Sequence, residues 1–151
     1  MNARRALPLA AVAVGLAATL APAGAAAPKT ISKTYDMQLL PLPLPAQGTV
    51  TCLPADGMEG LNKHTETLTA PAKGLLLAQV SGFTGDWDIS VFTASGKNIG
   101  VGSGTSTGGG APAMNATDKI KLKIKAAGTY QIVMCNYAGT PQATGKYTFT
   151  Y

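Results

Sequence analysis

Short runs in which apolar and polar residues alternate constrain the fold of this chain more than any other feature. The clearest is DKIKLKIKAAG, Asp118–Gly128, in which Ile120, Leu122 and Ile124 alternate with lysines. Residues spaced by two lie on the same face of a β-strand, so this run predicts a strand with these three side chains buried and the lysines exposed. Helices are not expected, because 18 glycines and 10 prolines interrupt the chain throughout.

Other segments show the same pattern. Trp87, Ile89 and Val91 alternate with Asp88 and Ser90, so the tryptophan is expected in the core. About seven or eight short strands separated by turns predict an all-β fold, an antiparallel β-sandwich of two sheets packed face to face. The further strands are expected at Thr30–Leu40, Thr49–Leu53, His64–Ala70, Leu75–Phe83 (largely apolar and therefore buried), Thr129–Tyr137 and Gly145–Tyr151.

The first 27 residues have the order of a secretory signal peptide. Arg4 and Arg5 precede an apolar run of 15 residues, Ala6–Leu20, and small residues follow up to a cleavage site between Ala25 and Ala27. The run is shorter than the roughly 20 apolar residues that a membrane-spanning helix needs. We therefore expect a secreted, extracellular protein without a transmembrane anchor, in which residues 28–151 form a single domain.

The two cysteines of the chain are Cys52 and Cys135, 83 positions apart (135 − 52). In an exported protein an even number of cysteines indicates a disulfide, whereas the alternative is two free thiols in a core. Residues 28–151 hold 10 lysines, no arginine and 7 acidic residues, a net charge of +3 (10 − 7). Because arginine is the usual residue for bidentate phosphate and guanine contacts, specific nucleic-acid binding is not expected.

Four segments between residues 66 and 151 resemble, in order, those of a known family. They are ETLTAPAKG, LLLAQVSGFTGDWDISVFTASGKNIG, AAGTYQIVM and GKYTFTY, and the stretch from about residue 62 to 151 resembles the bacterial pre-peptidase C-terminal (PPC) domain family. The resemblance implies a jelly-roll β-sandwich. Members are usually appended to secreted hydrolases, and some bind calcium or matrix polymers. Residues 28–61 lie outside the resemblance.

Asp86 and Asp88 are the sharpest polar pair. At a spacing of two on a strand both carboxylates point the same way and could reach one Ca²⁺, but calcium takes six to eight oxygen ligands and the spacing supplies no others. Asp36, Asp56, Asp118 or loop carbonyls would have to complete the site. The alternative is that the two aspartates cap the turn by accepting backbone N–H bonds. Calcium is the only cofactor that the sequence suggests.

Lys119, Lys121, Lys123 and Lys125 line one face of the expected strand at Asp118–Gly128. Their side chains would repeat every ~6.6–6.8 Å and could dock a polyanion. The alternative is a solvated outer face that discourages edge pairing.

No catalytic centre is expected. The chain has one histidine, His64, and no serine in a Gly-x-Ser-x-Gly turn. The sequence therefore predicts a monomeric, non-catalytic binding or accessory module for an extracellular protein, cell-wall or carbohydrate polymer. A secreted protease inhibitor is the alternative function, acting through an exposed loop at Gly102–Thr117 or at PLPLP, residues 41–45.

Overall fold

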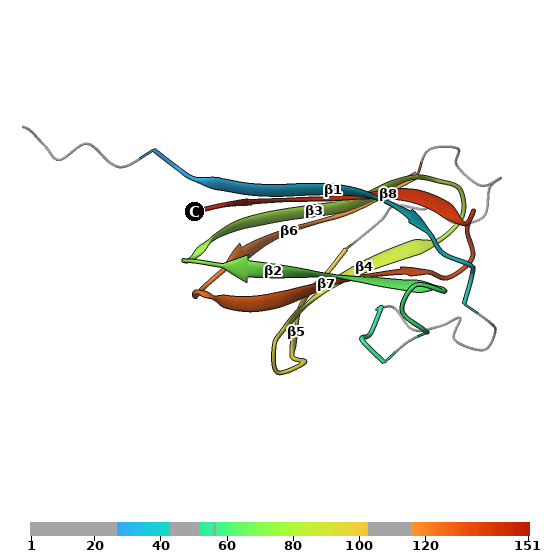
Figure 1. Cartoon of the computed structure of the whole chain (residues 1–151), viewed down its shortest axis with the longest axis horizontal. Helices are drawn as coiled ribbons and strands as arrows, with labels where there is room; N and C mark the ends of the chain where they lie inside the picture. The colour runs from blue at the N-terminus through green and yellow to red at the C-terminus, as the bar shows by residue number, and fades with distance from the viewer. Residues whose placement is uncertain (1–26, 43–51, 56, 103–115) are drawn as a thin grey trace, which may run out of the picture.

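The computed structural model describes residues 27–42, 52–55, 57–102 and 116–151. The described chain contains eight strands in two four-stranded antiparallel sheets, which confirms the predicted all-β sandwich (Figure 1). No helix in this part of the chain has the length and apolar character needed to cross a membrane. The strands are β1 (Thr30–Gln38), β2 (Lys63–Ala70), β3 (Gly74–Phe83), β4 (Trp87–Thr93), β5 (Asn98–Val101), β6 (Ala116–Ile124), β7 (Gly128–Asn136) and β8 (Gln142–Thr150).

The order of the strands is that of a jelly roll. Sheet A has the order β1-β8-β3-β6 and sheet B the order β2-β7-β4-β5. Successive strands therefore alternate between the sheets, except at the β4–β5 hairpin, as in two interlocked Greek keys. The end of β8 lies beside the start of β1, where Lys29 and Tyr151 exchange two backbone hydrogen bonds of 2.9 Å (Figure 1).

The main core lies between the sheets and follows the strand alternation. Trp87, Ile89 and Val91 of β4 are buried in it, as predicted. Among the described residues, sheet A is covered on its inner face alone, so β3 does not form the wholly buried strand that its apolar sequence predicts. Leu75 and Leu77 point outward and are 37% and 41% exposed.

A second apolar cluster covers the outer face of sheet B. Leu42 and Cys52, which follow β1 in the chain, lie on this face, and the Cys52–Cys135 disulfide ties Cys52 to β7 with the two Cα atoms 5.6 Å apart. The predicted disulfide is thus confirmed, and it explains why β7 is buried on both faces. The cluster consists of Leu42, Cys52, Phe92, Val133, Cys135 and Tyr137.

Residues 28–61, which the family resemblance left out, therefore provide an edge strand and the cover of sheet B. Of the short strand expected at Thr49–Leu53, Cys52 and Leu53 are not in a strand and the rest lies outside the described residues. The predicted signal peptide also lies outside them, apart from residue 27, as do residues 103–115 of the loop at Gly102–Thr117 and residues 43–45 of PLPLP.

Candidate functional site

The outer face of sheet A carries most of the lysines. Lys119, Lys121 and Lys123 of β6 are exposed on this face, and Lys125 is exposed just beyond the end of the strand. The inner residues Ile120 and Ile124 are buried, 6% and 2% exposed. The alternation predicted for this strand is therefore present, and it places a column of ammonium groups along one edge of the sheet.

Neighbouring strands extend this column into a surface. Lys121 lies opposite Leu77 of β3, which in turn lies opposite Thr148 of β8. In the next row Lys119 lies opposite Gln79, and Gln79 opposite Lys146. Lys119 and Lys146 are two strands apart, ~10 Å from the spacing of strands in a sheet. Positive charge therefore spreads across the sheet as well as along its edge.

The turn between β2 and β3 adds a sixth lysine. Lys73 and Leu75 line a shallow hollow together with Lys123 and Lys125. We call this surface the cationic face. It consists of Lys73, Lys119, Lys121, Lys123, Lys125 and Lys146 around the exposed side chains of Leu75 and Leu77.

The lysines of the cationic face are not neutralised by neighbouring acids. Within the described chain, ion pairs form between Lys33 and Glu66 and between His64 and two glutamates, and none involves the cationic face. Along the strands of sheet A, the acidic residue that shares the outer face is Asp36 on β1, whose carboxylate accepts a hydrogen bond of 3.0 Å from Thr144 Oγ1. Asp36 lies at the far side of sheet A from β6, so the cationic face keeps its charge.

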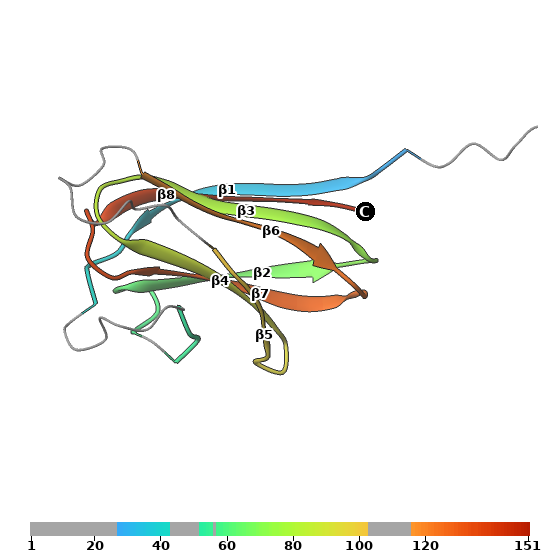
Figure 2. The same ribbon diagram turned by 180° about the vertical axis from the view of Figure 1, so that it is seen from behind.

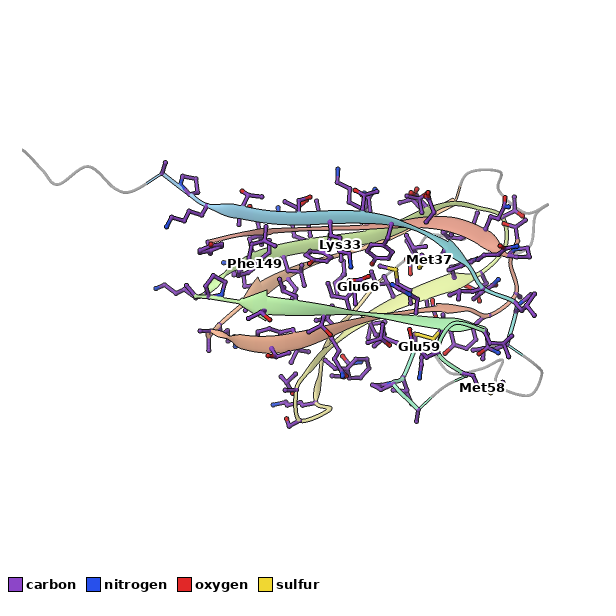
Figure 3. All side chains as sticks on the ribbon, in the orientation of Figure 1. Lys33, Met37, Met58, Glu59, Glu66 and Phe149 are labelled. Atoms are coloured by element: carbon purple, nitrogen blue, oxygen red, sulfur yellow. A yellow bond between two sulfur atoms is a disulfide. The ribbon has the colours of Figure 1, made fainter. Side chains whose placement is uncertain are left out.

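Two glutamates and the histidine gather instead at the opposite edge of the sandwich, where β1 and β2 end the two sheets. Figure 3 shows Lys33 and Glu66 between these two strands. Lys33 Nζ donates to both carboxylate oxygens of Glu66, at 2.9 and 2.7 Å. His64 Nε2 lies 3.0 Å from Glu66 Oε1, and the ring of His64 packs 4.9 Å from that of Tyr35. Glu66 therefore joins sheet A to sheet B.

The environment of Glu66 favours its charged form. Burial alone would raise the pKa of its carboxyl group, but the hydrogen bonds from Lys33 and His64 outweigh burial and hold the pKa below its ordinary value. The same hydrogen bond raises the pKa of Lys33. The single histidine is thus engaged in closing this edge, since its Nδ1 also lies 3.8 Å from Glu59 Oε1.

Asp86 is exposed just before β4, and Asp88 is partly buried on that strand. Among the described residues, no three His, Cys, Asp or Glu side chains come close enough together to hold a metal ion. Calcium at Asp86 and Asp88 therefore stays a prediction, as does the alternative that the two aspartates cap the turn. Burial, and then the negative charges of Asp86 and Asp118, raise the pKa of Asp88 to about 7.

Asp118 is the most unusual of the acidic residues, because it points into the core from β6. It is 1% exposed, and neither carboxylate oxygen has a hydrogen-bond partner. Burial raises its pKa to about 6, although the nearby backbone N–H groups of Ile89 and Lys119 act in the opposite direction without well-formed hydrogen bonds. Sequence reasoning named Asp118 as a further calcium ligand, but its burial was not foreseen.

Sequence reasoning found four of the six lysines of the cationic face. It missed Lys146 and Lys73, because neither belongs to the alternating run and only the pairing of β3 with β6 and β8 brings them to the same surface. Leu75 and Leu77 were missed for the related reason that they were assigned to the core. No signal in the sequence alone gives the neighbours of β3.

No family model matches the chain, and no curated protein matches its sequence. The resemblance to the PPC family therefore stays a prediction.

Proposed function

We propose that residues 28–151 are exported as a non-catalytic binding module whose cationic face docks an anionic polymer, such as an acidic cell-wall or extracellular polysaccharide. The observation that carries this proposal is the gathering of six lysines on one face without an ion-pair partner among the described residues. A protein of low net charge that concentrates its cations in this way creates a local positive potential that attracts polyanions.

The arrangement of the face supports a polymer rather than a small anion. Its lysines are spread over β6, β8 and the β2–β3 turn, with spacings of ~7 Å along a strand and ~10 Å across two strands. Thr148 and Ser32 add hydroxyl groups in the same row as Lys121, with their oxygens 3.3 Å apart. A polymer that repeats its negative charges could contact several lysines at once, whereas a single small anion could not.

Two further features support export and a family role. The Cys52–Cys135 disulfide is typical of proteins in oxidising compartments, in agreement with the predicted signal peptide. A jelly roll is the fold that the PPC resemblance implies, so we propose an accessory role of the kind found in that family. Sequencing the N-terminus of protein recovered from the culture medium tests export, and a start at residues 26–28 is expected.

Retention on immobilised heparin, used as a polyanionic probe, tests the cationic face. The double variant Lys121→Gln, Lys146→Gln removes two charges from the face. It should elute at clearly lower salt than the unmodified protein, because salt screens exposed charges and fewer lysines remain to compete with it. Its free energy of unfolding should change by less than about 0.5 kcal/mol, since both side chains are exposed.

The matched control is Lys29→Gln, which removes one charge from an exposed position outside the cationic face and is compared with the single variant Lys121→Gln. The control should elute close to the unmodified protein. If the two single variants shift equally, retention follows net charge and the face has no special role. If the unmodified protein is not retained at low salt, the proposed function is wrong.

A further inference from the structure

A groove opens at the edge of the sandwich where β5 of sheet B meets β6 of sheet A. Its volume is about 350 Å³, at the lower end of the range for small-molecule sites. Ile99 of β5, Leu122 of β6 and Tyr130 of β7 line it. Leu122 is only partly buried, contrary to the sequence prediction, because the strand facing it, β5, has four residues and leaves part of the inner side of β6 open.

The groove has a rigid apolar wall. Ile99 and Leu122 pack against the main core from its margin. The Tyr130 hydroxyl donates a hydrogen bond of 2.9 Å to the Ala126 carbonyl, which fixes the ring at the base of the β6–β7 turn. At Gly100 the two edge strands approach so closely that a Cβ atom would lie 2.6 Å from Ile120 Cδ1. The two edge strands are therefore in close contact next to the groove.

The rim of the groove is positively charged. Lys97, from the β4–β5 turn, and Lys123 and Lys125, from the end of β6, line it together with the apolar residues (Figure 2 shows the β4–β5 hairpin extending from the sandwich). No carboxylate lines the groove, and none of these three lysines forms an ion pair within the described chain. The site thus combines an apolar interior with an uncompensated cationic rim.

We propose that this groove binds a small amphiphile with a single anionic head group, of which a medium-chain fatty carboxylate is the type. The apolar tail lies against Ile99, Leu122 and Tyr130, where burial of apolar surface provides the affinity. The carboxylate lies at the rim among the ammonium groups of the lysines. A neutral amphiphile would lack this electrostatic attraction. The groove shares Lys123 and Lys125 with the cationic face, but Lys97, Ile99 and Leu122 lie outside that face. Variants at these three positions therefore test the groove separately, and this inference does not depend on the proposed function.

Calorimetric titration with laurate below its micelle concentration tests the proposal. Laurate should bind, whereas acetate, which has the head group alone, and dodecanol, which lacks the charge, should bind much more weakly or not at all. Lys97→Gln should weaken laurate binding by about three- to fivefold, the effect expected for one exposed ion pair. Lys29→Gln, the charge-matched control away from the groove, should leave laurate binding unchanged.

A second variant tests the apolar wall. Ile99→Ala should also weaken laurate binding, and because Ile99 is partly exposed the protein should keep its fold and its heparin retention. Absence of laurate binding, or equal binding of laurate by the unmodified protein and by both groove variants, would overturn the proposal. Conversely, Lys121→Gln, Lys146→Gln should affect heparin retention without affecting laurate, so the two proposals can fail separately.

Discussion

The buried carboxylate of Asp118 should make the protein less stable as the pH rises. Its pKa is raised from the ordinary 3.8 to about 6 in the folded protein, so between these values the folded chain binds more protons than the unfolded chain. The free energy of unfolding therefore falls as the pH increases from about 4 to about 6–7, and it stays reduced above that range. A pKa shift of this size corresponds to a loss of at most about 3 kcal/mol in the free energy of unfolding.

The substitution Asp118→Asn removes the charge and keeps the shape. At pH 8 it should remove the cost of burying a charged group, while the buried amide without a partner costs about 1–2 kcal/mol. The net increase in the free energy of unfolding should be about 1–2 kcal/mol. Below about pH 4 the gain should disappear, because Asp118 is then protonated in both states. The negative charge of Asp118 also contributes to the raised pKa of Asp88, so removing that charge relieves a repulsion between the two carboxylates and acts in the same direction at pH 8.

Urea unfolding followed by tryptophan fluorescence at several pH values between 4 and 8 measures the effect, since the one tryptophan, Trp87, is buried in the core. Asp36→Asn is the matched control, because it makes the same change of charge at an exposed position on sheet A. The stability difference between Asp118→Asn and the unmodified protein is compared at the two pH values. If the substitution is more destabilising at pH 8 than at pH 4, the carboxylate has a stabilising partner and the reasoning from its burial is wrong.

Three further outcomes are expected. Glu66→Gln should destabilise the protein by about 1–2 kcal/mol near pH 7. Because the pKa of Glu66 is lowered in the folded protein, this loss of stability should fade as the pH falls below the ordinary value of 4.5, and urea unfolding at pH 3 and pH 7 checks it. Ile124→Ala should lower the free energy of unfolding by about 2–5 kcal/mol, and Leu122→Ala should lower it clearly less, since Leu122 lies at the margin of the core. Thermal unfolding of the two variants measures the difference, and equal losses of stability would contradict the assigned burial. Reducing the Cys52–Cys135 disulfide should destabilise by about 4–5 kcal/mol from the entropy of an 83-residue separation, and mass spectrometry that finds two alkylatable thiols without reductant would refute the bond.

The fold was predictable from the sequence because its signals are local. Alternation of apolar and polar residues correctly predicted that Trp87 of β4 points into the core and that the lysines of β6 point outward. The disulfide was predictable because the chain has two cysteines. The burial of β3 was predicted wrongly, because Leu75 and Leu77 look like core residues when nothing in the sequence says that the outer face of sheet A is open. Alternation identifies which residues share a face, but it does not say whether another layer covers that face.

The candidate site was harder to predict because it depends on strand neighbours. Lys146 reaches the cationic face only because β8 pairs with β3, and the register of that pair is set by packing across the whole sheet. The burial of Asp118 likewise follows from its position on the inner face, because Asp118 has the same parity as Ile120 and Ile124 on β6. This burial was not predicted, because aspartate usually lies at the surface.

The order of strands has a consequence for how the chain is assembled. β8, the last of the described strands, lies between β1 and β3 in sheet A, and β7, which carries Cys135, lies between β2 and β4 in sheet B. The β4–β5 hairpin is the one pairing between strands that follow each other directly in the sequence. Neither sheet can close until β7 and β8 are available, because each of these strands pairs with a neighbour on both sides. Most strand pairings therefore join parts of the chain that are far apart in sequence, and such a fold forms slowly because long loops must close first.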